Sequence, residues 1–196
     1  MLRRVLVANR GEIACRVLRT ANRLGIDTVA LYSNPDVDAN HVKLADTAYA
    51  LGGVAAAESY LNADKIIQIA KDARADAIHP GYGFLSENAQ FADAVRDAKL
   101  VFIGPPAEAI RSMGAKDASK RLMEAAGVPL LPGYHGEDQS IETIRREAER
   151  CGLAEGLPVM LKAVLGGGGK GMRIVESAAA LDAAVESARR EAEASF

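Results

Sequence analysis

The sequence predicts an α/β protein in which about the first 105 residues form a doubly wound parallel sheet. Short apolar, β-branched runs alternate there with segments of helical periodicity, which is typical of a parallel sheet covered on both faces. After Pro105 the pattern changes to consecutive helices, and a polyglycine stretch then separates two short apolar runs. With 196 residues, 49% hydrophobic and 26% charged, the chain can form one large or two small globular domains.

The first strand is expected at residues 5–8, followed by a helix that ends before Gly25. Asn9 and Glu12 have the spacing of a capping box at the start of that helix. Asn62 is the expected cap of a later helix that carries the apolar positions Ile66, Ile67, Ile69 and Ala70. Further strands are predicted at residues 28–32, 48–51, 75–78 and 100–103, with another helix near residues 87–97.

The second half of the chain is predicted to be mainly helical. Helices are expected at residues 107–113, 116–126, 140–151 and 178–195, and the last carries apolar residues on one face and Glu–Arg pairs on the other. Lys116 lies near a helix start, where a cation gains nothing from the helix dipole. Taken alone, it is interpreted as a solvated surface lysine.

The polyglycine stretch is the strongest functional signal. An apolar run at residues 158–165 precedes Gly166, Gly167, Gly168 and Gly169, and a second strand follows at residues 172–175. Glycines expose backbone N–H groups that can surround phosphate oxygens. Lys162 lies among apolar neighbours of the first strand, where an ammonium group needs an anion. A phosphate site is therefore predicted, and a simple hairpin loop with a solvent-directed lysine is the alternative.

This stretch differs from a P-loop, because Lys170 is followed by Gly171 and a strand rather than by Ser or Thr and a helix. In a doubly wound sheet, ligands also meet the loops at the carboxyl ends of strands. Here these loops are residues 9–12 and 79–88. Gly81 and Gly83 do not complete a dinucleotide fingerprint. His79, Tyr82, Glu87 and Asn88 could supply polar site chemistry, or the segment could be a turn followed by a helix capped by Ser86.

Several classes of function are disfavoured. A net charge of −2 gives no basic field for nucleic acid. Cys15 and Cys151 are far apart and are expected to be reduced thiols, and no histidine has metal-ligand spacing, so no metal site is predicted in this chain. Met1 leads almost directly into a strand, with no signal or transit pattern and no membrane segment. A cytoplasmic protein is expected.

In the loops at residues 9–12 and 79–88 and in the Lys162 and polyglycine stretch, the sequence resembles the amino-terminal part of a biotin carboxylase, the ATP-grasp component of biotin-dependent carboxylases. The resemblance covers the whole chain. Residues 133–139 most resemble the alpha subunits of methylcrotonyl-CoA and related acyl-CoA carboxylases. The matching motifs are residues 7–14, 79–88, 102–105, 113–116, 126–129 and 162–173.

The resemblance implies a Rossmann-like domain at residues 1–112, then linker helices and a partial ATP-grasp lid at residues 113–196. It implies a ligase that uses ATP, bicarbonate and magnesium or manganese to carboxylate biotin on a carrier domain. Lys116 and Lys162 fall on the family's ATP-binding lysines, which revises the interpretation of Lys116. The glycines from Gly166 to Gly169 fall on the phosphate loop. A carboxyltransferase subunit and a homo-oligomer are implied as partners.

The family's metal-binding, bicarbonate-binding and catalytic residues are expected beyond Phe196. The sequence therefore predicts no catalytic residue in this chain and an inactive fragment when it is isolated. Two alternatives stay open. One is a fragment of another ATP-grasp ligase, of carbamoyl-phosphate or glycinamide-ribonucleotide type. The other is a nucleotide-binding module without catalysis.

Overall fold

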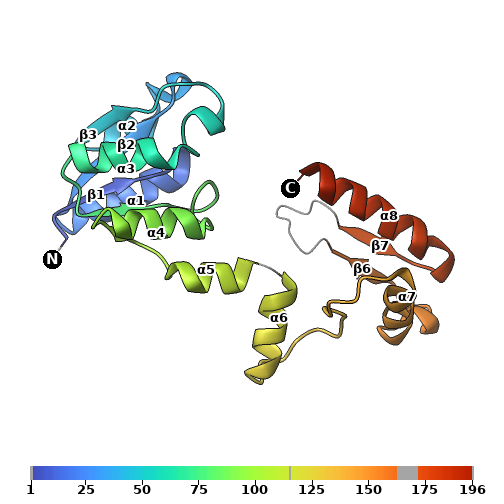
Figure 1. The fold of residues 1–196 in the computed structure, drawn as a ribbon. Coiled ribbons are helices and arrows are strands. Elements are labelled where there is room, and N and C mark those ends of the chain that lie inside the picture. The colour runs from blue at the N-terminus through green and yellow to red at the C-terminus, as the bar shows by residue number, and fades with distance from the viewer. Residues whose placement is uncertain (1, 115, 163–171, 196) are drawn as a thin grey trace. The chain divides into compact units, whose positions relative to one another are not determined.

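The computed structural model describes residues 2–114, 116–162 and 172–195 (Figure 1). The chain divides into two compact units, Met1–Arg111 and Ser112–Phe196. Helix α5, Ala107–Gly114, crosses this division.

The first unit is built on a five-stranded parallel sheet in the order β3-β2-β1-β4-β5. Strand β1 lies at its centre, where Leu6 pairs with Val29 of β2 on one side and with Ile78 of β4 on the other. The predicted doubly wound parallel sheet is therefore confirmed. The strands are β1 Arg4–Val7, β2 Asp27–Tyr32, β3 Thr47–Ala50, β4 Ala77–His79 and β5 Val101–Phe102.

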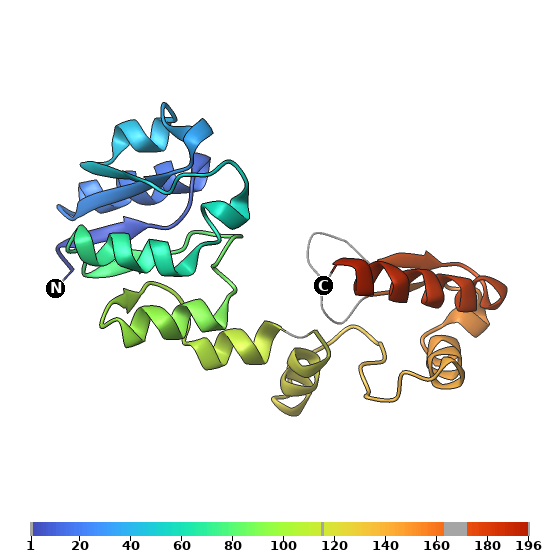
Figure 2. The same cartoon turned by 45° about the horizontal axis from the view of Figure 1, so that its top comes forward.

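Helices cover both faces of this sheet (Figure 1 and Figure 2). On one face α3, Ala63–Asp72, and α4, Ala89–Asp97, pack on a core that contains Leu6 and Ile78. On the other face α1, Gly11–Arg23, and α2, Asn40–Leu44, pack around Val7 and Ala30. Successive residues of β1 thus enter opposite cores, as the two-residue period of a strand requires.

Two predicted helix caps differ from the structure. Asn9 does not cap α1, whose N-cap Arg10 has no side-chain cap bond, because the Asn9 carboxamide is bonded to a distant loop. Ser86 does not cap α4 either, since Asn88 accepts the hydrogen bond from the Phe91 amide. The predicted cap by Asn62 is confirmed, because it accepts from the Lys65 amide.

The second unit combines helices with a two-stranded antiparallel hairpin, β6 Val159–Leu161 and β7 Arg173–Val175. Its helices are α6 Lys116–Ala125, α7 Ile141–Arg150 and α8 Ala178–Ser195. The small core joins α7, α8 and the hairpin. Its buried members are Ala148, Leu153, Val175, Leu181 and Val185. The short 3₁₀ turn Leu153–Glu155 also belongs to this unit, whereas the 3₁₀ turns Asn34–Asp36 and Ala56–Glu58 belong to the first unit.

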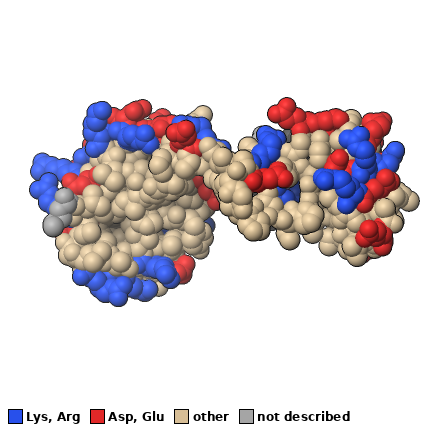
Figure 3. Space-filling model, turned by 90° about the horizontal axis from the view of Figure 1, so that it is seen from below, with Lys and Arg blue, Asp and Glu red and all other residues tan. Residues whose placement is uncertain are grey.

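Both charge signs occur on the surface of each unit in the view of Figure 3. This agrees with the small net charge of −2. Within the described part of the chain, no helix combines the length and the apolar character needed to cross a membrane.

Candidate functional site

The hairpin of the second unit has two different faces. Val159 pairs with Val175, Met160 with Ile174 and Leu161 with Arg173. Val159, Leu161 and Val175 pack against the core formed with α7 and α8. Since side chains alternate along a strand, Met160 and Ile174 point to the opposite face.

That opposite face is apolar and exposed to solvent. Met160 is 45% exposed and Ile174 is 64% exposed, and Met172, two residues before Ile174, is 38% exposed. Lys162 is also exposed and follows Met160 by two residues. If the register is continued by one residue, Lys162 stands opposite Met172. An ammonium group thus borders an apolar platform of three side chains.

Such a face matches two parts of a nucleotide. The flat, largely apolar base can cover Met160, Met172 and Ile174, which removes these side chains from water. The lysine offers a charge-assisted hydrogen bond to a phosphate oxygen. The arrangement can bind a base and a phosphate together.

Lys162 lies just outside the strand in which the sequence predicts it. The strand was expected to continue to residue 165 with Lys162 inside it, but β6 ends at Leu161, and Lys162 follows it with an exposed side chain. Its ammonium group is therefore solvated in this structure. The residue remains a candidate because of the face it occupies and not because of burial.

The other predicted ATP-binding residues are less fully described. Lys116 is the first residue of α6, and the structure does not describe its side chain. Gly166, Gly167, Gly168 and Gly169 lie outside the described residues. Their assignment to phosphate binding stays a prediction.

Arg173 links the hairpin to the last helix. Its guanidinium lies 2.5 Å from Glu191 Oε2 and 3.4 Å from Ser187 Oγ on α8. It also donates to the Met172 carbonyl oxygen at 2.9 Å. Because it points to the packed side of the hairpin, it supports the strand whose other face is exposed.

A second polar cluster lies at the carboxyl edge of the parallel sheet. The Arg10 guanidinium pairs with Asp36 at 3.2 Å. It also lies 5.7 Å from the ring centre of Tyr60 and 6.0 Å from that of Phe84. The two rings are stacked with their centres 5.1 Å apart. Arg10 is thereby held by an ion pair and by the faces of two aromatic rings.

Asp36 and Tyr60 were not predicted as members of any site. The Tyr60 hydroxyl donates to Asp36 Oδ2 at 2.7 Å, and the Ser33 hydroxyl donates to the same oxygen at 2.8 Å. Ser33 precedes the short turn that contains Asp36 and lies only three positions away, so this pair is local in sequence. No local sequence signal joins Tyr60 to Asp36, because the two residues are 24 positions apart in separate turns.

These contacts shift pKa values in opposite directions. Burial alone would raise the pKa of Asp36, but hydrogen bonds from Tyr60, Ser33 and Arg10 lower it below its ordinary value. Burial and the bond to Asp36 raise the pKa of Tyr60 to about 12. Burial lowers the pKa of His79. At neutral pH Asp36 is therefore ionised, while Tyr60 and His79 are neutral.

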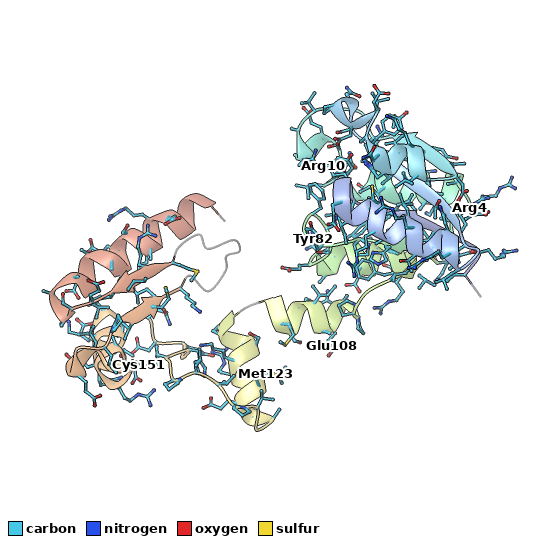
Figure 4. The ribbon with its side chains drawn as sticks, turned by 180° about the vertical axis from the view of Figure 1, so that it is seen from behind. Arg4, Arg10, Tyr82, Glu108, Met123 and Cys151 are labelled. Atoms are coloured by element: carbon cyan, nitrogen blue, oxygen red, sulfur yellow. The ribbon has the colours of Figure 1, made fainter. Side chains whose placement is uncertain are left out.

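The same edge contains a hollow of about 360 Å³. Figure 4 shows Arg10 and Tyr82 on the side of the first unit away from Arg4, which starts the central strand. The hollow is thus at the carboxyl ends of the strands, where doubly wound sheets bind ligands. Its lining residues are Asn9, Arg10, Gly11, Ile13, Tyr82, Gly83 and Phe84.

Of the two polar loops predicted at this edge, the structure brings Asn9, Arg10 and Tyr82 together, whereas Asn88 caps a helix. Within residues 2–114, 116–162 and 172–195, no group of three or more His, Cys, Asp or Glu side chains could hold a metal ion.

Comparison with known families matches both units. Residues 1–110 match the family described as "Biotin carboxylase, N-terminal domain". Residues 115–196 match the family "Carbamoyl-phosphate synthase L chain, ATP binding domain".

Individual relatives agree with these families. The chain is 57% identical over 98% of its length to the mitochondrial methylcrotonoyl-CoA carboxylase subunit alpha of Dictyostelium discoideum, of which it spans 27%. It resembles the biotin carboxylase of Campylobacter jejuni in a β,γ-ATP complex, with a TM-score of 0.93 and 44% identity, covering all of this chain and 43% of that one.

The biotin carboxylase domain dimer of Hydrogenobacter thermophilus 2-oxoglutarate carboxylase, solved with MgADP, ADP and bicarbonate, gives a TM-score of 0.89 at 47% identity. The match covers all of this chain and 42% of that domain. The chain thus spans about a quarter to two fifths of the length of these relatives.

Proposed function

Because the chain belongs to the biotin carboxylase family through its amino-terminal domain, we propose that it is the ATP-lid part of such an enzyme. The complete protein would be an ATP-dependent ligase that uses ATP and bicarbonate to carboxylate carrier-bound biotin. Residues 1–112 are assigned to the amino-terminal domain, and residues 113–196 to the linker helices and the lid. The 57% identity to an acyl-CoA carboxylase alpha subunit favours that class of carboxylase.

The observation that carries this proposal is the exposed face of the hairpin. Met160, Met172 and Ile174 form a platform for the adenine base, and Lys162 stands beside them for a phosphate. Lys116 and the glycines from Gly166 to Gly169 are proposed as further phosphate contacts. Two ammonium groups would offset part of the polyphosphate charge.

Magnesium or manganese is proposed to act with ATP by offsetting phosphate charge. The described residues contain no cluster of His, Cys, Asp or Glu side chains that fits such an ion. Biotin is proposed to arrive on a carrier domain, and a carboxyltransferase subunit is proposed to use the carboxylated product.

Assembly and compartment are part of the same proposal. We place a homo-oligomer in the complete enzyme, and the H. thermophilus relative is described as a domain dimer. A cytoplasmic compartment stays a prediction, and the D. discoideum relative is described as mitochondrial.

Substitution of Lys162 tests the assignment. In the complete protein, Lys162→Gln should weaken ATP binding about 10- to 100-fold, because a charged hydrogen bond to phosphate is lost. Lys71→Gln is the matched control, since Lys71 is an exposed lysine at the end of α3. Calorimetric titration with ATP measures both variants. Equal ATP affinities for the two variants would contradict the proposed site.

The alternatives differ in the substrate that triggers ATP turnover. A biotin carboxylase releases ADP when bicarbonate and biotin are both supplied. A carbamoyl-phosphate or glycinamide-ribonucleotide type ligase would require an amino-group donor or that ribonucleotide. A module without catalysis would bind ATP and release no ADP. Steady-state ADP release by the complete protein under these conditions separates the three functions.

A further inference from the structure

Asn9 is a buried amide whose hydrogen bonds reach across the carboxyl edge of the sheet. The residue is 3% exposed. Its Nδ2 donates to the carbonyl oxygens of Pro80 and Tyr82, both at 2.8 Å. Its Oδ1 accepts from the Arg10 amide at 2.9 Å. Both donors and the acceptor of one carboxamide are thus in use.

These bonds join two loops that are about 70 residues apart in sequence. One is the turn from β1 into α1, which carries Arg10. The other is the turn from β4 toward α4, which carries Tyr82, Gly83 and Phe84. Together the two turns line the hollow of about 360 Å³. Asn9 therefore sets the spacing between the two sides of that hollow.

The second turn contains one strained residue, Phe84, next to glycines that adopt positive φ freely. Gly81 and Gly83 both have a φ of +66°, and Phe84 has a φ of +41°, which side chains of its size rarely adopt. A Cβ atom on Gly81 would lie 2.7 Å from Asn9 Nδ2, so the backbone of the turn passes directly over the carboxamide. Such a turn needs support from its surroundings. The stacking of Phe84 on Tyr60 and the bond from the Gly81 amide to His79 give part of it, and the two bonds from Asn9 tie the turn to the opposite loop.

A carboxamide fits this position and a carboxylate does not. A carboxylate at the same place would put an oxygen where Nδ2 now lies, 2.8 Å from two carbonyl oxygens. That oxygen accepts and cannot donate, so both bonds would become repulsive. By contrast Asn62, the cap of α3, uses its Oδ1 as the acceptor from Lys65, a role that aspartate also fills.

We propose that Asn9 is a positioning residue that fixes the two turns carrying Arg10 and Tyr82 on either side of the hollow at the carboxyl edge of the sheet. The part of this inference that concerns catalysis rests on the proposed function and extends it, because the hollow lies at the carboxyl ends of the strands, where doubly wound sheets bind ligands. The structural part stands on the contacts of Asn9 alone.

A fluorescence experiment on the 196-residue chain tests the structural part. The chain contains no tryptophan, and Tyr82 is 65% exposed, so Tyr82→Trp gives a single reporter on the supported turn. Asn9→Asp and Asn62→Asp are each introduced into the Tyr82→Trp variant. Both make the same chemical change in the same unit. Acrylamide quenching measures how accessible the introduced tryptophan is to solvent, and its fluorescence anisotropy measures how freely it moves. Circular dichroism and thermal unfolding show whether each variant is still folded.

With Asn9→Asp we expect a higher quenching constant and a lower anisotropy, with the helical signal retained, and no change with Asn62→Asp. Equal quenching for the two variants would overturn the proposal. If Asn9→Asp does not fold, Asn9→Ala replaces it, because alanine removes the donors without adding a charge. Loss of the fold in both Asn9 variants would overturn positioning in favour of a purely structural role.

Kinetics of the complete protein, with Tyr82 intact, test the catalytic part. A displaced loop should lower kcat about tenfold or more in Asn9→Asp, while the KM for ATP changes less than about twofold. Asn62→Asp should match the parent. An unchanged kcat for Asn9→Asp would refute the catalytic part. A parent protein without bicarbonate-dependent ADP release would refute the proposed function and leave the fluorescence result standing.

Discussion

The two units differ in how completely their strands are buried. In the first, strand β1 is covered on both faces, and Leu6 and Val7 are fully buried. In the second, only one face of the hairpin is covered, and Met160 and Ile174 of the other face stay exposed. The first unit thus has a core that can support it alone, whereas a two-stranded hairpin depends on the helices behind it.

This difference in burial suits the two units to different tasks. A rigid sheet holds polar loops in fixed positions at its carboxyl edge. A weakly supported hairpin with an open face can adjust to a ligand that covers it. If the two units differ in this way, they should respond separately to the same kinds of change.

The largest effect is expected from truncating one buried leucine in each unit. Leu6 and Leu181 are both fully buried. Their replacement by alanine should cost about 2–5 kcal/mol each. Leu6→Ala should destabilise the first unit, and Leu181→Ala should unfold the second unit while the first stays folded. Hydrogen exchange resolved by peptide measures this. Loss of protection in both units with either variant would show that they fold as one.

A smaller effect is expected from removing one helix cap in each unit. Asn62 accepts from Lys65 at 3.0 Å in the first unit, and Ser140 accepts from Thr143 at 3.3 Å in the second. Alanine at either position should cost about 1 kcal/mol. Ser140→Ala should raise exchange in α7 more visibly, because the surrounding core is smaller. Asn62→Asp is the control, because aspartate keeps the capping oxygen and should leave the stability unchanged. An identical response of both units would argue against their difference in stability.

Ion pairs within the second unit should contribute less still. Arg173 and Glu191 join the hairpin to α8 at 2.5 Å and are each about one third exposed. Arg190 and Glu186 lie on the surface of the same helix, 3.8 Å apart. A double-mutant cycle with glutamine should give at most about 1 kcal/mol for the first pair and a few tenths for the second. A larger coupling for the exposed pair would contradict the anchoring role of Arg173.

The mildest perturbation is a change of pH. Burial lowers the pKa of His79 from 6.5, so the folded first unit binds fewer protons than the unfolded chain. The stability that His79 contributes is therefore complete above pH 6.5 and is lost as the pH falls below that value. Asp138 of the second unit has a pKa lowered from 3.8 by hydrogen bonds from Thr143 and Ser140. The stability that the ionised Asp138 contributes is therefore lost only as the pH falls below 3.8.

Between pH 6.5 and pH 4, the turn around Gly81 should therefore respond before α7 does, because the Gly81 amide donates to His79 Nδ1 at 3.0 Å. Amide NMR shifts follow both regions during the titration. His79→Asn keeps an acceptor at this place and does not titrate, so it should remove the early response. A Gly81 shift that persists in this variant would rule out His79 as its source.

Local sequence signals predicted the parts of the structure that depend on local chemistry. Alternating apolar runs predicted the parallel sheet, and Asn62 predicted the start of α3. The same kind of signal was wrong at Asn9, because its spacing to Glu12 fits a capping box while its side chain is bonded to Pro80 and Tyr82. Contacts between distant turns, such as those of Arg10 with Asp36 and Tyr60, leave no local pattern in the chain.

Hydrogen exchange of the complete protein with and without ATP tests the central claim most directly. The amides of Leu6 and Val7 should exchange slowly in both states. Those of Val159–Leu161 and Arg173–Val175 should exchange faster without ATP and slow about tenfold or more when ATP covers the exposed face. Protection of the hairpin equal to that of β1 without ATP, or hairpin exchange that ATP does not change, would contradict the account.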